Sequence, residues 1–225
     1  MVDIFNEIDD ELRRDKLSRF WNRHAGKVLA LLVVAVLVTG GLSYRQYQIN
    51  QAGQDAAKRL NDISKLTKDG KNDEVEKALQ ELSLSKASGY QLIARFRLAA
   101  EIGKRDMNEG VKAFKKIAED ASLPQNLRDF ATLRAVMLNF DTVSFQDTRI
   151  AMGALDASTH ALRNGAREVL GLAAFKEGLM DDAGRYFDLI QIDPQATASM
   201  RSRVEVYSEL VRAAPKAKPN VKSGS

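Results

Sequence analysis

The side chains that most often carry catalysis are few in this chain and lie far apart in the sequence. It has 225 residues, no cysteine and only two histidines, His24 and His160. The absence of cysteine excludes disulfides, thiolate metal sites and cysteine nucleophiles. His160 follows Ser158-Thr159, but a serine hydrolase would also need an orienting acid and an oxyanion hole. We therefore interpret Thr159 as a helix cap.

Motifs for metal, phosphate or acyl-transfer chemistry are also missing. The sequence contains no H-E-x-x-H, no Walker lysine loop and no G-x-S-x-G. Of the acidic runs Asp9-Asp10-Glu11 and Asp181-Asp182, the second suits the first turn of a helix, where the helix dipole favours negative charge. We expect no catalytic residue, no metal, no cofactor and no small-molecule substrate, so the protein should not be an enzyme. The alternative, a hydrolase or transferase, would need a cleft with converging ionisable groups.

A long uncharged stretch predicts one transmembrane helix. Residues 28–44 carry no charge, and ten of them are Leu or Val. Extended back to Ala25, the helix has a length of about 30 Å, which matches the hydrocarbon core of a bilayer. A buried core helix is disfavoured because no polar face exists, and a cleaved signal peptide because the preceding segment is rich in acids and no A-x-A site follows. We assign the membrane span to residues 25–44.

The Lys and Arg residues around this span predict its orientation. Six of them fall between Arg13 and Lys27, whereas Arg45 stands alone after the span until Lys58. The denser side stays in the cytoplasm, so the rest of the chain is exported, in a bacterium to the periplasm. The cytoplasmic segment 1–24 carries apolar residues at four-residue spacing. Two interpretations remain open for it: an interfacial helix, or a solvated arm that continues into the span.

The exported part should be entirely helical. The chain has 14 Gly and 4 Pro, which is few for a β-rich fold, and no segment alternates polar and apolar residues. Apolar residues recur at three- and four-residue spacing instead. This pattern predicts helices at 46–68, 73–83, 89–103, 107–120, 124–138, 145–155, 162–177, 181–191 and 196–212. We expect Gly70 to form the first turn.

Charge argues against nucleic acid as a partner. Residues 45–211 hold 24 Lys or Arg and 24 Asp or Glu, so this domain is neutral, whereas a nucleic-acid-binding domain should be basic. The net charge of +4 belongs to residues 212–225, which contain four Lys or Arg and no acid. We expect this segment to be a disordered basic tail.

The unit ending at Pro194 resembles a tetratricopeptide (TPR) repeat. Four features agree with that family: Leu170-Gly171 in the first helix, Gly178 at the turn, and Ala183 and Phe187 in the second helix. Gly171 should allow the two helices to approach closely, and Gly178 can adopt the positive φ of a helix end. The resemblance implies a TPR-like helical-repeat (α-solenoid) domain at 45–211, with the helix at 196–212 as its cap.

The same unit departs from the family at one position and offers a candidate binding surface. Arg167 stands where the family has tryptophan. In the TPR register the concave side of the first helix carries the candidate protein-binding residues Glu168, Leu172, Phe175 and Lys176. The alternative is that Leu172 and Phe175 pack against the adjacent helix.

The whole layout resembles a narrower group, the YfgM-type ancillary subunits of the bacterial Sec translocon. The layout consists of a short charged N-terminus, Phe20-Trp21 before a single span, and a degenerate TPR domain outside. The most similar segments are 127–134 and 166–187. The resemblance implies a non-enzymatic inner-membrane subunit that contacts a SecYEG-type translocon and a membrane-anchored periplasmic chaperone. The alternative is a periplasmic TPR scaffold or adaptor for envelope assembly or cell division.

Overall fold

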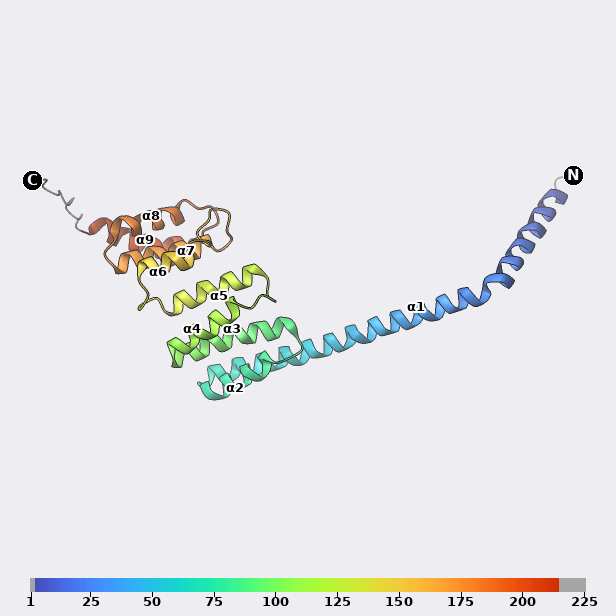
Figure 1. Cartoon of the computed structure of the whole chain (residues 1–225), viewed down its shortest axis with the longest axis horizontal. Helices are drawn as coiled ribbons and strands as arrows, with labels where there is room; N and C mark the ends of the chain where they lie inside the picture. Colours follow the sequence, from blue (N-terminus) through green and yellow to red (C-terminus); the bar gives the residue numbers. More distant parts are fainter. Residues whose placement is uncertain (1–2, 215–225) are drawn as a thin grey trace, which may run out of the picture.

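The computed structural model describes residues 3–214, and of residues 3–23, 25, 28 and 88 only the backbone. Its described part consists of nine helices and contains no strand, which confirms the predicted all-α class (Figure 1). The helices are α1 (Asp3–Lys68), α2 (Asn72–Ser83), α3 (Ser88–Arg105), α4 (Met107–Ala118), α5 (Gln125–Leu138), α6 (Phe145–Met152), α7 (Arg163–Lys176), α8 (Met180–Gln191) and α9 (Ala198–Ala213). The expected tail residues 215–225 lie outside the described part.

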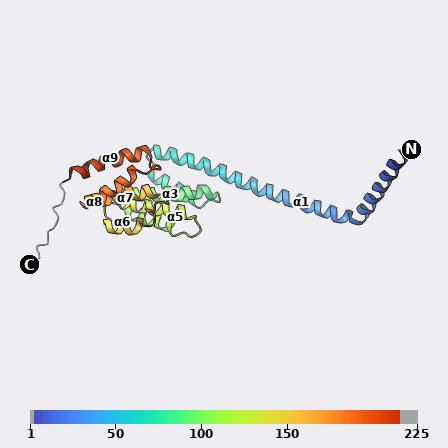
Figure 2. The ribbon, with the colours of Figure 1, turned by 90° about the horizontal axis from the view of Figure 1, so that it is seen from above.

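Helix α1 is 66 residues long and joins two predicted helices into one. The sequence predicts a boundary between the apolar stretch and the helix at 46–68, but no proline interrupts this part of the chain, and the backbone stays helical. The segment 29–68 is long and apolar enough to cross a membrane, and its most apolar window is 0% buried. Figure 2 shows α1 leading away from the other helices as one long helix that bends sharply toward its N-terminal end.

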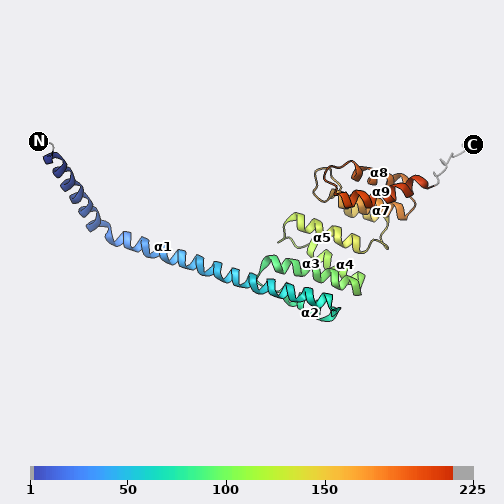
Figure 3. The same ribbon diagram turned by 180° about the vertical axis from the view of Figure 1, so that it is seen from behind.

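The remaining helices stack on the C-terminal end of α1 in chain order (Figures 1 and 3). Each packs against its neighbours in sequence, so the pairs α1–α2, α3–α4, α5–α6 and α7–α8 form an array that α9 closes. Gly70 and Gly178 have φ of 72° and 77°, a left-handed conformation that glycine adopts at little cost. These two glycines end α1 and α7, as predicted, and let the chain reverse into the second helix of the pair.

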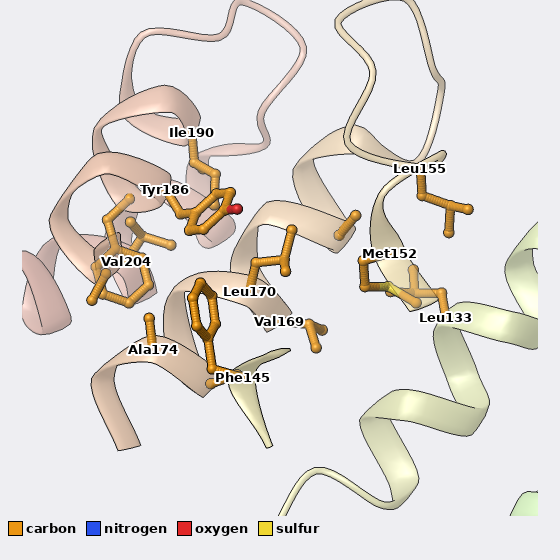
Figure 4. Packing of buried hydrophobic residues seen from close by; sticks show 14 of the residues in the cluster. Leu133, Phe145, Met152, Leu155, Val169, Leu170, Ala174, Tyr186, Ile190 and Val204 are labelled. Atoms are coloured by element: carbon orange, nitrogen blue, oxygen red, sulfur yellow. The ribbon is translucent and has the colours of Figure 1, made fainter. Parts of the chain in front are cut away.

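Three apolar clusters hold the array together. The first lies between α1, α2 and α3 around Ile63 and Leu79, and the second between α3, α4 and α5 around Phe114. The third and largest joins α6 to α9, and Figure 4 shows Leu170, Tyr186 and Ile190 gathered in it. Such an array is stabilised pair by pair, because each unit contacts only the next.

Helix α5 is shared between two of these clusters. It buries Ala131 and Ala135 in the second cluster and Leu133 in the third. On the far side of this joint, Leu133 lies against Gly165, where a Cβ would stand 3.0 Å from its Cδ2. The position of α5 therefore determines how the first half of the array meets the second.

Candidate protein-binding surface

The TPR-like marks of α7 and α8 form a close helix crossing. A Cβ added to Gly171 would lie 2.4 Å from Cε1 of Phe187, closer than real atoms approach. Ala183 and Phe187 are both completely buried in the same cluster. The missing side chain at Gly171 thus leaves room for the Phe187 ring, and the two helices approach closely, as the sequence predicted.

Arg167, which replaces the family's tryptophan, is a buried member of an ion-pair network. Its Nε lies 3.0 Å from Asp156 Oδ1 and its Nη1 3.2 Å from Asp193 Oδ2. Asp193 also accepts two bonds from Arg163, at 2.5 and 2.7 Å. The Arg163 guanidinium and the backbone N–H of Gln195 hold the pKa of Asp193 well below its usual range. The sequence did not predict this network, and its one sign there is Arg167 in place of the family's tryptophan.

Three of the four candidate binding residues on α7 pack within the array. Glu168 accepts bonds from Nε and Nη2 of Arg203 on α9, at 2.9 and 3.0 Å. The Phe175 ring stands edge-on to Tyr207 of α9, with centroids 5.6 Å apart. Leu172 and Phe175 are half-buried against the third cluster. This arrangement matches the packing alternative left open for Leu172 and Phe175.

The fourth candidate, Lys176, binds backbone carbonyls. Its Nζ lies 2.8 Å from the carbonyl oxygen of Phe140, 3.3 Å from that of Asp141 and 2.7 Å from that of Val143. The next residue, Glu177, accepts a bond from the backbone N–H of Phe145 at 2.6 Å. Together these two side chains fasten the α5–α6 turn to the end of α7. The structure brings all four candidates onto one helix, but their role in binding a partner stays a prediction.

Helices α3 and α5 carry exposed apolar side chains that the sequence did not single out. Ile93 is 44% exposed, Phe130 40% and Met137 45%. The rings of Phe96 and Phe130 lie 5.5 Å apart, so the two helices contact each other through these rings. These side chains could have been found in the sequence, because the apolar stripes of α3 and α5 are wider than a single packing face requires. We add these three exposed side chains to the candidate binding residues of α7.

His160 has a structural role. Its Nδ1 accepts a bond from the backbone N–H of Leu162 at 3.1 Å, so Nε2 carries the proton and donates to Asp129 Oδ2 at 3.0 Å. The predicted cap Thr159 is wrong, because α7 begins only at Arg163 and its N-cap residue is Leu162. Asp181 and Asp182 do lie in the first turn of α8, as expected.

The ionisable groups that converge at the surface pair with one another. In a hollow between α2 and α3, Glu76 pairs with Arg105 at 3.0 Å and Glu101 with Lys104 at 2.8 Å. Among the residues with described side chains, no group of three or more His, Asp or Glu could hold a metal ion. Nothing in this part of the chain points to enzymatic activity.

Comparison with known proteins identifies a family. Residues 18–188 match the model of a family described as tetratricopeptide repeat-like domain. The matched range covers the apolar part of α1 together with α2 to α7 and most of α8. Neither the curated proteins nor the solved structures give a significant match.

Proposed function

Because the chain belongs to the tetratricopeptide repeat-like domain family, we propose that it is a membrane-anchored, non-enzymatic interaction subunit. Domains of this kind are typically interaction modules without catalysis. One observation carries the proposal: α1 contains the apolar stretch and, further along the same helix, the first packing surface of the array. Any protein bound to the array is thereby held close to one membrane site.

We place this subunit in a bacterial inner membrane, with residues 1–24 in the cytoplasm, 25–44 as the span, and the domain 45–211 in the periplasm. The excess of Lys and Arg before the apolar stretch supports this orientation. The partners in this proposal are a SecYEG-type translocon beside the span and a membrane-anchored periplasmic chaperone on the array. The similarity in layout to YfgM-type subunits supports them, as does a helical array that offers contact area without reactive groups.

Crosslinking from the exposed part of α1 tests the translocon contact. A photoreactive amino acid at Gln46 or Gln48, just beyond the apolar stretch, should capture subunits of the export channel in intact membranes. Deleting residues 1–44 should abolish the capture and leave the array folded, since its first fully buried residue is Ala56. A matched crosslinker at exposed Gln195, at the far end of the array, should capture other proteins.

Capture of envelope-assembly or division enzymes at Gln46, with no export subunit among the products, would contradict the translocon proposal. In that case the protein is a scaffold for envelope assembly or division, and its deletion should alter cell shape or septation rather than export. Membrane anchoring would stand in both cases.

A further inference from the structure

The neutral array separates its charges by helix. Helices α3, α5 and α7, the first of their pairs, carry four, two and three Lys or Arg, and one Asp or Glu each. Among the second helices of the pairs, α2 carries one Lys or Arg and four Asp or Glu, and α4 carries three Lys or Arg and one Asp or Glu. Helix α6 carries one of each kind, and α8 carries one Lys or Arg and three Asp or Glu. Helices α3, α5 and α7 thus hold nine basic and three acidic residues, and α2, α4, α6 and α8 hold six basic and nine acidic. The domain has no net charge as a whole, but this set of three helices is basic.

The same pair of residue types recurs on all three basic helices. An apolar residue is followed four positions later by a cation, as Ile93–Arg97 on α3, Phe130–Arg134 on α5 and Leu172–Lys176 on α7. Residues four apart lie on one face of a helix. Met137 extends the apolar part of this face on α5. We call these seven residues the apolar–basic face.

The cations of the apolar–basic face have no carboxylate partner among the described residues. Arg97 contacts only the Ser64 hydroxyl, at 3.5 Å, and the Arg134 guanidinium lies over the Phe114 ring, 5.8 Å from its centroid. Lys176 binds carbonyl oxygens, which satisfy its donors and leave its charge uncompensated.

The carboxylates on the same three helices, in contrast, all have partners. Glu101 pairs with Lys104 at 2.8 Å, Asp129 with His160 at 3.0 Å and Glu168 with Arg203 at 2.9 Å. The face therefore presents positive charge beside exposed apolar surface, and each carboxylate of these helices is bound to a residue outside the face.

We propose that the apolar–basic face binds a polypeptide segment in which acidic and apolar side chains are interspersed. Arg97 and Arg134 bind its carboxylates, and Ile93, Phe130 and Met137 contact its apolar side chains. Guanidinium groups suit this task because they form charge-assisted, often bidentate, hydrogen bonds with carboxylates. This inference rests on the proposed function and specifies the chemistry of the segment that the array recognises.

The length of α1 favours a polypeptide over a lipid surface as the occupant. From Tyr44, the end of the predicted span, to Ala56, the first fully buried residue of the array, the helix rises about 18 Å. Headgroup charges are screened over about 8–10 Å at physiological salt, so the apolar–basic face lies beyond their reach.

Fluorescence anisotropy on the full-length protein in detergent tests the proposal. The probe is a labelled peptide of alternating glutamate and leucine, and the reference is the same peptide with glutamine in place of glutamate. The acidic peptide should bind, with an affinity that falls as salt rises, and the glutamine peptide should bind much more weakly. The double variant Arg97→Gln/Arg134→Gln should weaken binding of the acidic peptide about tenfold or more. Arg149→Gln removes one exposed charge from α6 and should change little.

Three outcomes would overturn the proposal: equal binding of both peptides, equal weakening by Arg149→Gln, or binding only to phosphatidylglycerol vesicles. Circular dichroism of the double variant checks that the helices remain. The same variant carrying a crosslinker at Gln46 separates this inference from the proposed function. Peptide binding without capture of the export channel contradicts the translocon role alone, and capture without peptide binding contradicts the binding face alone.

Discussion

At Gly171 the space that a side chain would need is already occupied by the Phe187 ring. Gly171→Ala should force that ring aside and lower the free energy of unfolding by about 1–3 kcal/mol, in the range of other overpacked cores. Gly184→Ala is the matched control on α8, because its Cβ would meet Val211 at an ordinary 3.4 Å. Without a clash, this change should stabilise the helix by up to about 1 kcal/mol. Urea unfolding followed by circular dichroism measures both variants, and equal effects would rule out the close crossing.

Asp193 should make the second half of the array sensitive to acid. Its pKa is lowered in the folded protein, so its contribution to stability is complete above the ordinary value of 3.8 and is lost as pH falls through the folded value. Asp193→Asn should lower the melting temperature at neutral pH, because Arg163 and Arg167 lose a buried partner. Below pH 3.8 the difference from wild type should shrink.

Asp182→Asn serves as the control for Asp193, since Asp182 forms an exposed pair with Arg185 at 3.0 Å. Exposed pairs of this kind contribute little, so the melting temperature should hardly change. Thermal scans of the three proteins between neutral pH and pH 3 give the comparison. A loss as small for Asp193→Asn as for Asp182→Asn would show that the network is dispensable.

The difference between these residues explains what the sequence could predict. Gly178 and Gly171 have roles set by local geometry, a positive φ and a close approach, and motif spacing indicates both. Asp193 pairs with Arg163 across 30 residues, and no local pattern indicates that distance. The Thr159 prediction failed for a related reason, because the irregular segment after α6 is held by a contact between His160 and Asp129 of α5.

At the scale of helices, Lys176 and Glu177 hold the α5–α6 turn against α7. Lys176→Met keeps much of the side chain and removes the ammonium that binds the turn's carbonyls. Hydrogen bonds to charged groups contribute about 1.5–3 kcal/mol, so amide exchange in residues 140–145 should accelerate roughly tenfold. Lys115→Met, at an exposed position on α4, should leave that exchange unchanged. Hydrogen exchange measured by mass spectrometry compares the two variants. Similar exchange profiles for both would contradict the proposal that Lys176 holds the α5–α6 turn against α7.

Helix positions were predictable because each helix of the array buries one apolar stripe, and its period is visible in the sequence. The ends of helices were less predictable. Helix α6 ends at Met152, three residues before the expected end at 155. The continuity of α1 was also missed. The expected boundary at Tyr44 followed from composition, which separates apolar from polar surroundings but does not interrupt backbone hydrogen bonds.

For the whole molecule, the excess of Lys and Arg before the apolar stretch predicts a fixed orientation in the membrane. Alkaline phosphatase fused after Ser225 should be active in a bacterial host, and the protein should stay in the membrane pellet after a carbonate wash. Replacing Arg13, Arg14 and Lys16 with glutamine and adding lysines after Tyr44 should reduce or reverse that activity. Recovery of the unmodified protein in the soluble fraction would contradict the span and every membrane role built on it.

Because α1 is unbroken between the apolar stretch and the array, the number of residues between them determines the direction in which the array faces around the helix axis. Each residue inserted between Tyr44 and Ala56 turns everything beyond it by about 100° and lifts it by 1.5 Å, as in any α-helix. Two added alanines would point the apolar–basic face nearly backward, whereas seven would restore its heading to within about 20° at a greater height. If a neighbour in the bilayer must contact that face, crosslinking to it should disappear with two added alanines and return with seven. Helix α1 then sets the orientation of the array as well as anchoring it.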